Sequence, residues 1–215
     1  MRIFLAGASG VVGRRLVPLL LARGHLVWGT TRSEAKAAQL GDLGAIPVMV
    51  DVFDRQKLIE AVVTAAPQVV VHQLTDLPEN LDPSKMQAAI AGNARIRDEG
   101  TRNLVEAARQ AGVSRVVAQS IAWAYAAGPL PHGEDDRLDA KAEGARGITM
   151  GGVIALERQV LGAAGIEGVV LRYGQFYGPG TGVDTPAGTS PVHVDAAAHA
   201  ALLAVDRGRA GIYNI

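Results

Sequence analysis

The sequence opens with an apolar run, Arg2-Ile3-Phe4-Leu5-Ala6, that leads directly into Gly7-Ala8-Ser9-Gly10-Val11-Val12-Gly13. The residues after this glycine motif follow a helical pattern. Gly7 permits a tight turn, Gly10 lets the backbone approach a pyrophosphate, and Gly13 lets the helix pack close to the strand. The helix N-terminus adds free N–H groups and a positive dipole end. The motif therefore predicts a dinucleotide-binding turn with contacts from Gly7, Ser9, Gly10, Val11, Val12 and Gly13, and the alternative is a glycine-rich turn without a ligand.

Apolar segments of strand length alternate with segments of helical period along the rest of the chain. Runs such as Val69-Val70-Val71 are apolar on both faces, as in a parallel sheet covered by helices on both sides. The pattern predicts an α/β fold: a Rossmann-type doubly wound parallel sheet of about seven strands, in a single domain spanning residues 1–215. The predicted strands are Arg2–Ala6, Leu26–Thr30, Pro47–Val50, Val69–Gln73, Arg115–Gln119, Val169–Tyr173 and Ile212–Asn214.

Several helices have recognisable start signals. Ser33 and Asp54 are predicted N-caps of helices over 34–40 and 55–65, and Asp195 of a helix over 196–205. Ser84, with Gln87 three residues later, predicts a capping box at the start of one long helix over 84–111. Residues 124–147 and 177–191 are predicted loops, and we expect the substrate-side elements at about 124–147 and 174–194.

Composition excludes several classes of function. The 21 Lys and Arg balance 21 Asp and Glu, and there is no Cys. A neutral chain with scattered cations is not suited to nucleic acid, and without cysteine there is no disulfide scaffold or thiol nucleophile. The acidic run 134–137 is expected to be a solvated loop, and the spacing of His193 and His199 does not indicate a metal site. We expect a cytoplasmic protein with a small-molecule ligand and no membrane partner.

The end of the second predicted strand indicates which dinucleotide binds. An acidic side chain about 20 residues after the glycine motif would hold the ribose 2′-hydroxyl of NAD, whereas an arginine suits the 2′-phosphate of NADP. Arg32 stands there, followed by Ser33, and Arg14 and Arg15 are further candidates for phosphate contacts. The sequence therefore predicts NADP(H) in preference to NAD(H), the alternative being a surface arginine. Asp51 is either an acceptor for the adenine amino group or a carboxylate that stabilises a turn.

Beyond the glycine motif, other segments resemble the extended short-chain dehydrogenase/reductase family, which includes NAD-dependent epimerases and dehydratases of nucleotide sugars. The resemblance implies the same fold and cofactor site, and it adds Val52, Gln73, Leu74 and Tyr173 to the predicted cofactor contacts. It also implies a possible homodimer through the helices over 84–111 and 149–161. The matching segments are Asp51-Val52, Val70 to Leu74, Gly100 to Ala108, Leu171 to Gly180 and Val192 to Asp195.

The residues that carry proton transfer in that family are absent here. The family uses a Tyr, a Lys four residues later, and a Ser or Thr after the fifth strand. Aligned on Glu157, the Tyr position is Thr149 and the Lys position is Val153. Aligned without gaps on Arg115 and Tyr125, the Ser or Thr position falls on Ile121. Where the family often has Asn in the long helix, this chain has Arg97. The segment between residues 182 and 192 is also short, so we expect a much reduced C-terminal substrate region.

Other side chains are candidates for the missing roles. Ser120 and Tyr125 follow the fifth predicted strand and are predicted catalytic residues, with a core or wall role as the alternative for Tyr125. Trp123, Gln175 and Tyr177 are predicted to line the substrate pocket. His72 is expected to be a packed histidine rather than a base.

Three functions remain open on the sequence. The first is an atypical NADP(H)-dependent oxidoreductase that transfers hydride to or from a small carbonyl or alcohol. The alternative is a non-catalytic NADP(H) sensor, which the three absent residues favour. The third, a nucleotide-sugar epimerase or dehydratase, rests on family analogy alone.

Overall fold

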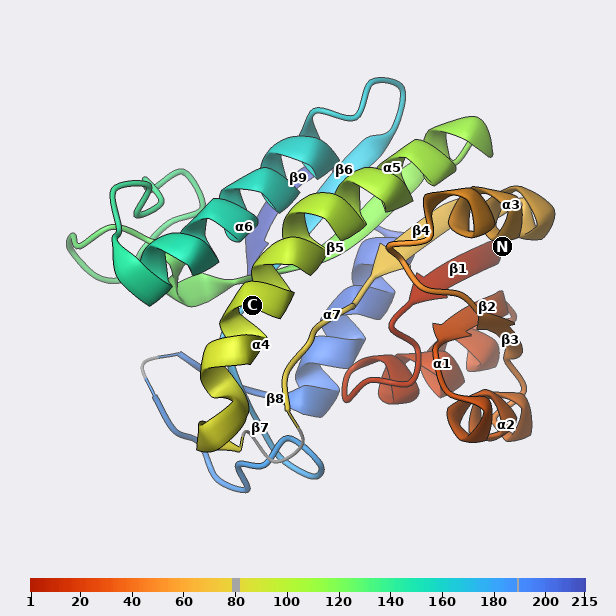
Figure 1. Cartoon of the computed structure of the whole chain (residues 1–215), viewed down its shortest axis with the longest axis horizontal. Helices are drawn as coiled ribbons and strands as arrows, with labels where there is room; N and C mark the ends of the chain where they lie inside the picture. The colour runs from red at the N-terminus through yellow and green to blue at the C-terminus, as the bar shows by residue number, and fades with distance from the viewer. Residues whose placement is uncertain (79–81, 189) are drawn as a thin grey trace.

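The computed structural model describes residues 1–78, 82–188 and 190–215, so Thr189 of the predicted loop over 177–191 lies outside the described residues. Seven parallel strands form one sheet in the order β3-β2-β1-β4-β5-β6-β9 (Figure 1). They are β1 (Arg2–Ala6), β2 (Leu26–Thr31), β3 (Ile46–Met49), β4 (Val69–His72), β5 (Arg115–Ile121), β6 (Glu167–Tyr173) and β9 (Gly211–Asn214). The predicted doubly wound sheet is confirmed, with its order reversing between β1 and β4.

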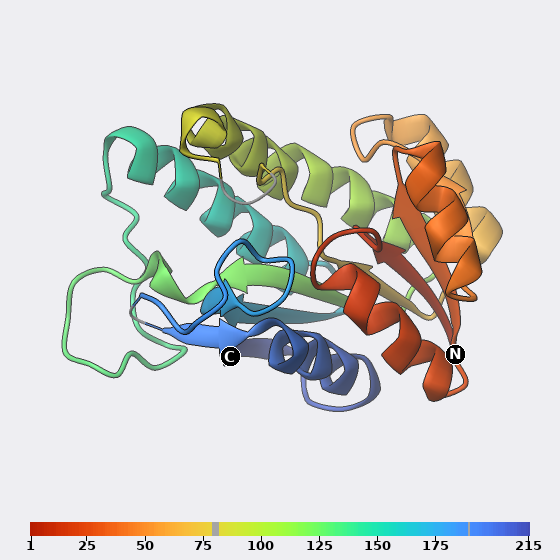
Figure 2. The same ribbon diagram turned by 90° about the horizontal axis from the view of Figure 1, so that it is seen from below.

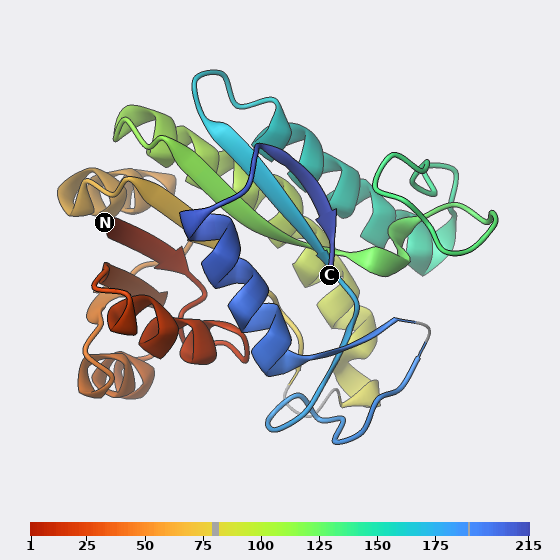
Figure 3. The ribbon, with the colours of Figure 1, turned by 180° about the vertical axis from the view of Figure 1, so that it is seen from behind.

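Helices cover both faces of the sheet (Figure 2). The helices are α1 (Gly13–Ala22), α2 (Glu34–Asp42), α3 (Arg55–Ala65), α4 (Met86–Arg95), α5 (Thr101–Gln110), α6 (Gly144–Leu161) and α7 (Val194–Asp206). Alternate residues of β1 face opposite sides: Ile3 and Leu5 pack with α1 and α7, which lie side by side in Figure 3, whereas Phe4 and Ala6 pack with α3, α5 and α6. Because successive side chains of β1 point to opposite faces of the sheet, this strand contributes to two apolar cores, one on each face.

The predicted long helix is a composite. A 3-10 turn, η2 (Pro83–Lys85), precedes α4, and a π-helical turn, η3 (Ile96–Gly100), joins α4 to α5. Both internal glycines allow close approaches: a Cβ at Gly92 would lie 2.1 Å from Asp76 Oδ2, and one at Gly100 would lie 3.2 Å from Val52 Cγ1. The helix therefore packs tightly against the loops that follow β3 and β4.

Two of the predicted helix caps are confirmed and two are wrong. The side chains of Ser33 and Asp54 accept hydrogen bonds from Lys36 N and Lys57 N. Ser84 is not a cap, because its N–H and hydroxyl both donate to Asp82 Oδ1. Asp195 lies inside the first turn of α7, where its carboxylate pairs with Arg15 of α1, and His193 is the residue that caps α7.

The substrate-side region consists of two short connections. The first contains the 3-10 turn η4 (Ala122–Ala124) and ends where α6 begins at Gly144, three residues before the predicted end of this loop. In the second, β7 (Gln175–Tyr177) pairs in parallel with β8 (Pro191–His193) and forms a separate two-stranded sheet. This small sheet lies within the predicted substrate-side element over 174–194.

Candidate functional site

A cavity of about 820 Å³ lies at the carboxyl ends of the central strands. It extends from the glycine motif and the end of β2, past the ends of β4 and β5, to the π turn, α6 and the segment over 175–188. Ligand sites of open α/β sheets lie at this edge, beside the point where the strand order reverses. Its size is that of a small-molecule or cofactor site.

The three glycines of the motif have different surroundings. Gly7 has a φ of +88°, and a Cβ there would lie 2.7 Å from the backbone of Gln73. A Cβ at Gly13 would lie 2.2 Å from the Gly7 carbonyl oxygen, whereas one at Gly10 would meet only that oxygen, at 3.3 Å. The protein's own packing therefore accounts for Gly7 and Gly13, and Gly10 leaves room on the cavity side.

The helix that follows the motif is open to an anion. No side chain caps its N-terminus at Val12, which leaves backbone N–H groups available. Gly7, Ser9, Gly10, Val11 and Arg14 line the cavity, whereas Val12 is buried in the core and Gly13 lies against the turn. Arg15 points elsewhere, because its guanidinium pairs with Asp195. The predicted contacts of Val12 and Gly13 are thus limited to their backbone, and Arg15 does not line the cavity.

Polar side chains gather where the ribose of a bound dinucleotide would lie. Arg32, Ser33 and Lys36 line the cavity together with Asp51. Arg32 Nη1 is 3.7 Å from Asp51 Oδ2, and both side chains are largely exposed. Asp51 Oδ1 also accepts a hydrogen bond of 2.9 Å from Phe53 N, which is the turn-stabilising role. The sequence analysis missed Lys36, although its place in the first turn after β2 was the available signal.

The end of β4 supplies a buried amide to the same cavity. Val52, Gln73 and Leu74 line it as predicted. Gln73 is only 4% exposed, and neither its amide oxygen nor its amide nitrogen has a hydrogen-bond partner in the described part of the chain. A buried amide without partners is costly unless a ligand supplies them. This amide and the glycine cradle fit a bound dinucleotide.

Tyr173 does not contribute to this site. Its ring is buried in the core, its hydroxyl donates to Ala197 O at 3.1 Å, and it does not line the cavity. Burial raises the pKa of this phenol well above its usual range. The predicted cofactor contact from Tyr173 is therefore replaced by a packing role.

The predicted catalytic pair lies in a buried ionic network instead of the cavity. Arg172 donates to both carboxylate oxygens of Glu157, through Nε at 3.0 Å and Nη2 at 2.8 Å. Ser120 Oγ donates to Glu157 Oε1 at 2.7 Å, and Tyr125 OH donates to Asn214 Oδ1 at 2.6 Å while accepting from Arg172 Nη1. Neither Ser120 nor Tyr125 lines the cavity. Their hydroxyls satisfy the buried charges, and this placement does not support the catalytic assignment.

The predicted substrate residues are divided between cavity and surface. Trp123, which is 40% exposed, and Gln175 both line the cavity. Tyr177 does not, because its ring packs edge-on against His193 with centroids 5.1 Å apart. Its neighbour Phe176 lines the cavity beside Gln175.

The positions of the family's proton-transfer residues form an almost apolar surface. Thr149 and Ile121 line the cavity, and Thr149 Oγ1 donates to Ala145 O within its own helix at 3.1 Å. Val153 is fully buried against Ile121 and Met150. The alignment of these positions is therefore consistent with the structure, and no phenol or ammonium stands among them.

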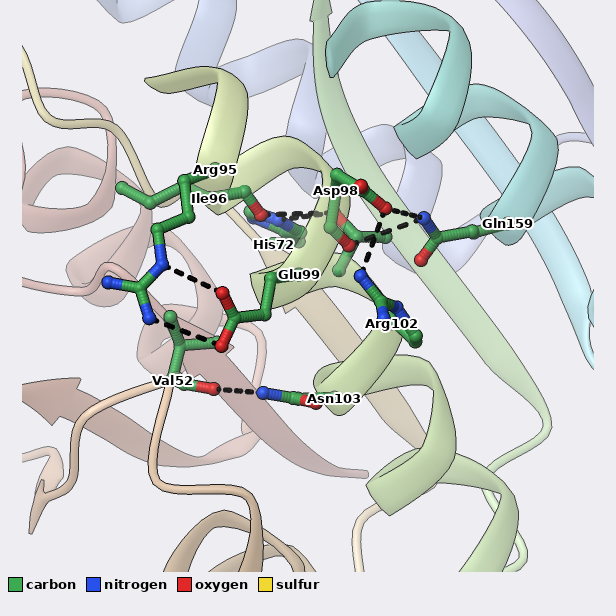
Figure 4. A network of polar contacts seen from close by, with 10 residues as sticks. Val52, His72, Arg95, Ile96, Asp98, Glu99, Arg102, Asn103 and Gln159 are labelled. Atoms are coloured by element: carbon green, nitrogen blue, oxygen red, sulfur yellow. Dashed lines mark hydrogen bonds and ion pairs between the residues drawn. The ribbon is translucent and has the colours of Figure 1, made fainter. Parts of the chain in front are cut away.

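The π turn places Arg97 at the cavity wall. Burial lowers the pKa of its guanidinium to about 10, which leaves it charged at neutral pH. Figure 4 shows that neighbouring charges on the turn are paired, Arg95 with Glu99 and Asp98 with Arg102. In the part of the chain that the structure describes, no carboxylate lies within ion-pair distance of Arg97. The sequence analysis noted Arg97 only as a departure from the family pattern.

His72 is held as a neutral side chain beside this turn. Its Nδ1 accepts from Leu74 N at 3.2 Å, so its Nε2 carries the proton toward Thr101 Oγ1 at 3.1 Å (Figure 4). Burial, with a contribution from the charge of Arg97, lowers its pKa to about 4. This placement agrees with a packed histidine.

Within residues 1–78, 82–188 and 190–215, no cluster of three or more His, Cys, Asp or Glu side chains has the arrangement of a metal site. No helix of those residues has the length and apolar character needed to cross a membrane.

Comparison with known proteins identifies relatives over the whole chain. A 3-diazoavenalumate denitrifying reductase from a Streptomyces species is 41% identical over all of this chain and 75% of its own length. UDP-glucose 4-epimerase of Thermotoga maritima superposes with a TM-score of 0.80 at 20% identity, covering 100% of this chain and 76% of the epimerase, which shows the fold. MoeE5 in complex with UDP-glucuronic acid and NAD gives 0.76 at 26% identity, covering 100% and 76%. The profile of the NAD dependent epimerase/dehydratase family matches residues 3–211, and the chain belongs to that family.

Proposed function

We propose that the protein is an NADP(H)-dependent reductase whose hydride acceptor needs no proton from a protein side chain, with a diazonium group as the substrate class. The observation that carries the proposal is the surface formed by Ile121 and Thr149, behind which Val153 is buried. The cavity of the glycine motif reaches this surface, which lacks the family's phenol and ammonium. An oxidoreductase is the coarser conclusion that family membership and the reductase relative support.

The cofactor would be held by residues already placed around the cavity. The N-terminus of α1 and Arg14 face the space for the pyrophosphate, and Gln73 offers a buried amide with both polar atoms unpaired in the described structure. When bound, a reduced dinucleotide supplies a hydride. Leu74 and Ile121 line the same cavity with apolar side chains and limit the access of water to it.

The preference for NADP(H) is supported by charge. Arg32 and Lys36 provide two cations and Ser33 a hydroxyl at the end of β2, all at the cavity. A 2′-phosphate suits such a set, because charge-assisted hydrogen bonds from guanidinium and ammonium groups are strong. Asp51 faces the same region, and its ion pair with Arg32 at 3.7 Å leaves the guanidinium free to reorient.

The chemistry of the acceptor explains why a proton donor is dispensable. Hydride addition to a carbonyl creates an alkoxide that must be protonated, which is the role of the family's Tyr and Lys. When hydride replaces nitrogen on a diazonium carbon, a C–H bond forms, the C–N bond breaks, and neutral N₂ leaves with the bonding electrons. No oxyanion develops in that exchange. A diazo substrate in the name of the 41% identical reductase supports this class.

The test is turnover with purified protein. We expect NADPH oxidation and release of N₂, measured by absorbance and mass spectrometry, with a panel of arenediazonium salts, and little turnover with matched aldehydes, ketones and quinones. The Gly10→Val variant, which fills the cofactor side of the cavity, serves as the control for uncatalysed reduction. Turnover confined to the carbonyl panel would overturn the substrate class.

The same experiment decides between an enzyme and a sensor. A non-catalytic NADP(H)-binding protein has the same glycine motif, and it has no need of the absent proton-transfer residues. Tight NADPH binding by calorimetry with no turnover on either panel would favour the sensor. Absence of dinucleotide binding would overturn both functions.

A further inference from the structure

We infer that Arg97 is the binding site for an anionic group of the substrate, a carboxylate in the first instance, on the part of the cavity formed by the π turn, β5 and α6. This assignment rests on the proposed function for the substrate being reduced there. It names the charge that the substrate carries, which the hydride chemistry does not specify. Arg97 is suited to this role by its place on the π turn, by the lack of a counter-ion among the described residues and by its apolar surroundings.

The π turn is the structural reason for the position of Arg97. Five residues, Ile96 to Gly100, form this wider turn between two regular helices. Such turns occur mostly as single insertions in α-helices and frequently at functional sites. Ile96 and Arg97 line the cavity, whereas Asp98 and Glu99 on the same turn form ion pairs at the surface. The turn thus presents one cation to the cavity and the anions to solvent.

The electrostatics of this position call for an anion. A cation that loses hydration without gaining a partner is destabilising, and nearby His72 is held neutral. Among the described residues, the other polar side chains at that part of the wall are Gln73, Asn93, Gln119 and Thr149, and all are uncharged. A ligand that brings a negative charge would compensate the guanidinium, and Gln73 has unpaired amide atoms to add a hydrogen bond.

The cofactor is not the source of that charge. Its phosphates have their own partners in the α1 N-terminus, Arg14 and Arg32, on the part of the cavity formed by β1 and β2. The nicotinamide is neutral when reduced and cationic when oxidised, so a guanidinium without a counter-ion in the same cavity would oppose hydride release. A substrate carboxylate paired with Arg97 would remove that opposition.

The remaining wall indicates the body of the substrate. Ile121 ends β5 and the exposed indole of Trp123 follows it, and Met86 and Ile90 of α4 line the same cavity. Flat apolar groups pack well against such side chains. The structure therefore favours an aromatic or unsaturated carboxylic acid over a sugar.

The assignment is tested by binding, without turnover. Benzoate and cinnamate, with benzamide and cinnamamide as neutral counterparts, are titrated by calorimetry into protein saturated with NADP⁺. We expect the wild type to prefer each acid over its amide, and Arg97→Met to weaken acid binding by about 10- to 100-fold with amide binding unchanged. Arg97→Lys should retain part of the preference. Arg102→Met, which removes an exposed arginine of the adjoining α5, is the matched control and should bind acids as the wild type does.

Two results would overturn the assignment. One is equal binding of acids and amides by the wild type, including no binding of either. The other is a loss of NADP⁺ affinity in Arg97→Met as large as the loss for cinnamate, which would make Arg97 a cofactor residue. If Arg97 governs acid binding and no diazonium compound is reduced, the proposed function fails while the anion site stands.

Stability gives a second readout that a structural role would not produce. Removal of a partly buried cation that has no counter-ion among the described residues should leave the melting temperature of the ligand-free protein unchanged or higher, because the desolvation cost disappears. We expect Arg97→Met to behave in this way in thermal unfolding. A lower melting temperature would indicate that Arg97 stabilises the fold, and it would contradict a site kept for ligand binding.

Discussion

Gly10 and Gly13 differ in what an added methyl group would meet. At Gly13 the methyl would lie 2.2 Å from a backbone oxygen, which cannot move without distorting the turn. We expect Gly13→Ala to lower the free energy of unfolding by about 2–4 kcal/mol in urea denaturation. Gly10→Ala should stay close to wild-type stability and weaken NADPH binding, since its methyl points into the cavity. Equal destabilisation by both variants would contradict the separate roles of the two glycines.

Arg32 carries the prediction of cofactor preference. We expect Arg32→Ala to weaken NADPH binding by about tenfold and to leave NADH binding nearly unchanged, because only the 2′-phosphate is lost as a partner. Calorimetry with both cofactors measures the difference. Arg23→Ala, which removes an exposed arginine outside the cavity, is the control. A parallel loss for NADPH and NADH would show that Arg32 does not read the phosphate.

At single residues, sequence reasoning succeeded where the chemistry is local. The glycine motif, Arg32 and Gln73 stand directly after strands, so their place at the cavity follows from the topology. It failed for Ser120 and Tyr125, because their partners Glu157 and Arg172 come from distant elements that no local pattern connects to them. Arg97 was undervalued because an arginine in a helix usually lies at the surface.

Among the secondary-structure elements, the buried pair of Glu157 and Arg172 joins α6 to β6. Glu157→Gln leaves the guanidinium buried without its counter-ion, so we expect a loss of about 3–5 kcal/mol in the free energy of unfolding. The double variant Glu157→Gln with Arg172→Met should recover part of that loss. Urea denaturation of the wild type, both single variants and the double variant measures the effect, and independent, additive losses would contradict the pairing.

Tyr125 in the same network separates a structural from a catalytic role. Tyr125→Phe removes the hydrogen bond to Asn214 and the one accepted from Arg172, and we expect a loss of about 1–3 kcal/mol in stability with an unchanged kcat. A large fall in kcat with the fold intact would restore the catalytic assignment that the sequence first suggested.

The helices and strands were predicted well because their periodicity is strong, and the exceptions have physical causes. The π turn widens the helix locally, but it changes the spacing of apolar residues too little for the sequence pattern to reveal it. The cap at Ser84 failed because Asp82 offers its hydroxyl and N–H a nearer acceptor. The short strands β7 and β8 were not predicted, because they form only where two separate segments of the chain pair with each other.

For the molecule as a whole, His72 makes stability depend on pH. Its pKa is about 4 in the folded protein against 6.5 for the unpaired side chain, so the unfolded chain binds a proton first as pH falls. The contribution of His72 to the free energy of unfolding is therefore fully present above pH 6.5, the pKa of the unfolded side chain. It decreases as the pH falls toward the folded pKa of about 4, by about 3 kcal/mol in total. His72→Asn, whose amide oxygen replaces Nδ1 as acceptor, should lose this share of the pH dependence in unfolding experiments from neutral to acidic pH. An unchanged slope would place the titration elsewhere.

The fold itself was predictable because every level of the sequence agrees with it. Strand-length apolar runs, helix starts and the glycine motif all indicate repeated βα units, and that repetition fixes a parallel sheet. The residues of the substrate side were harder to predict from the sequence, since loops without periodicity determine which side chains face the cavity.

The position of β1 at the centre of the sheet also bears on how the protein is made. On the ribosome, β1 emerges before either of its cover helices, and α7, which shields Ile3 and Leu5 together with α1, follows almost two hundred residues later in the printed sequence. Until α7 arrives, one apolar face of the nascent sheet stays open to water and to other chains. The growing polypeptide is therefore a natural client for chaperones that bind exposed apolar strands, and a slow decoding rate before α7 would prolong that exposure.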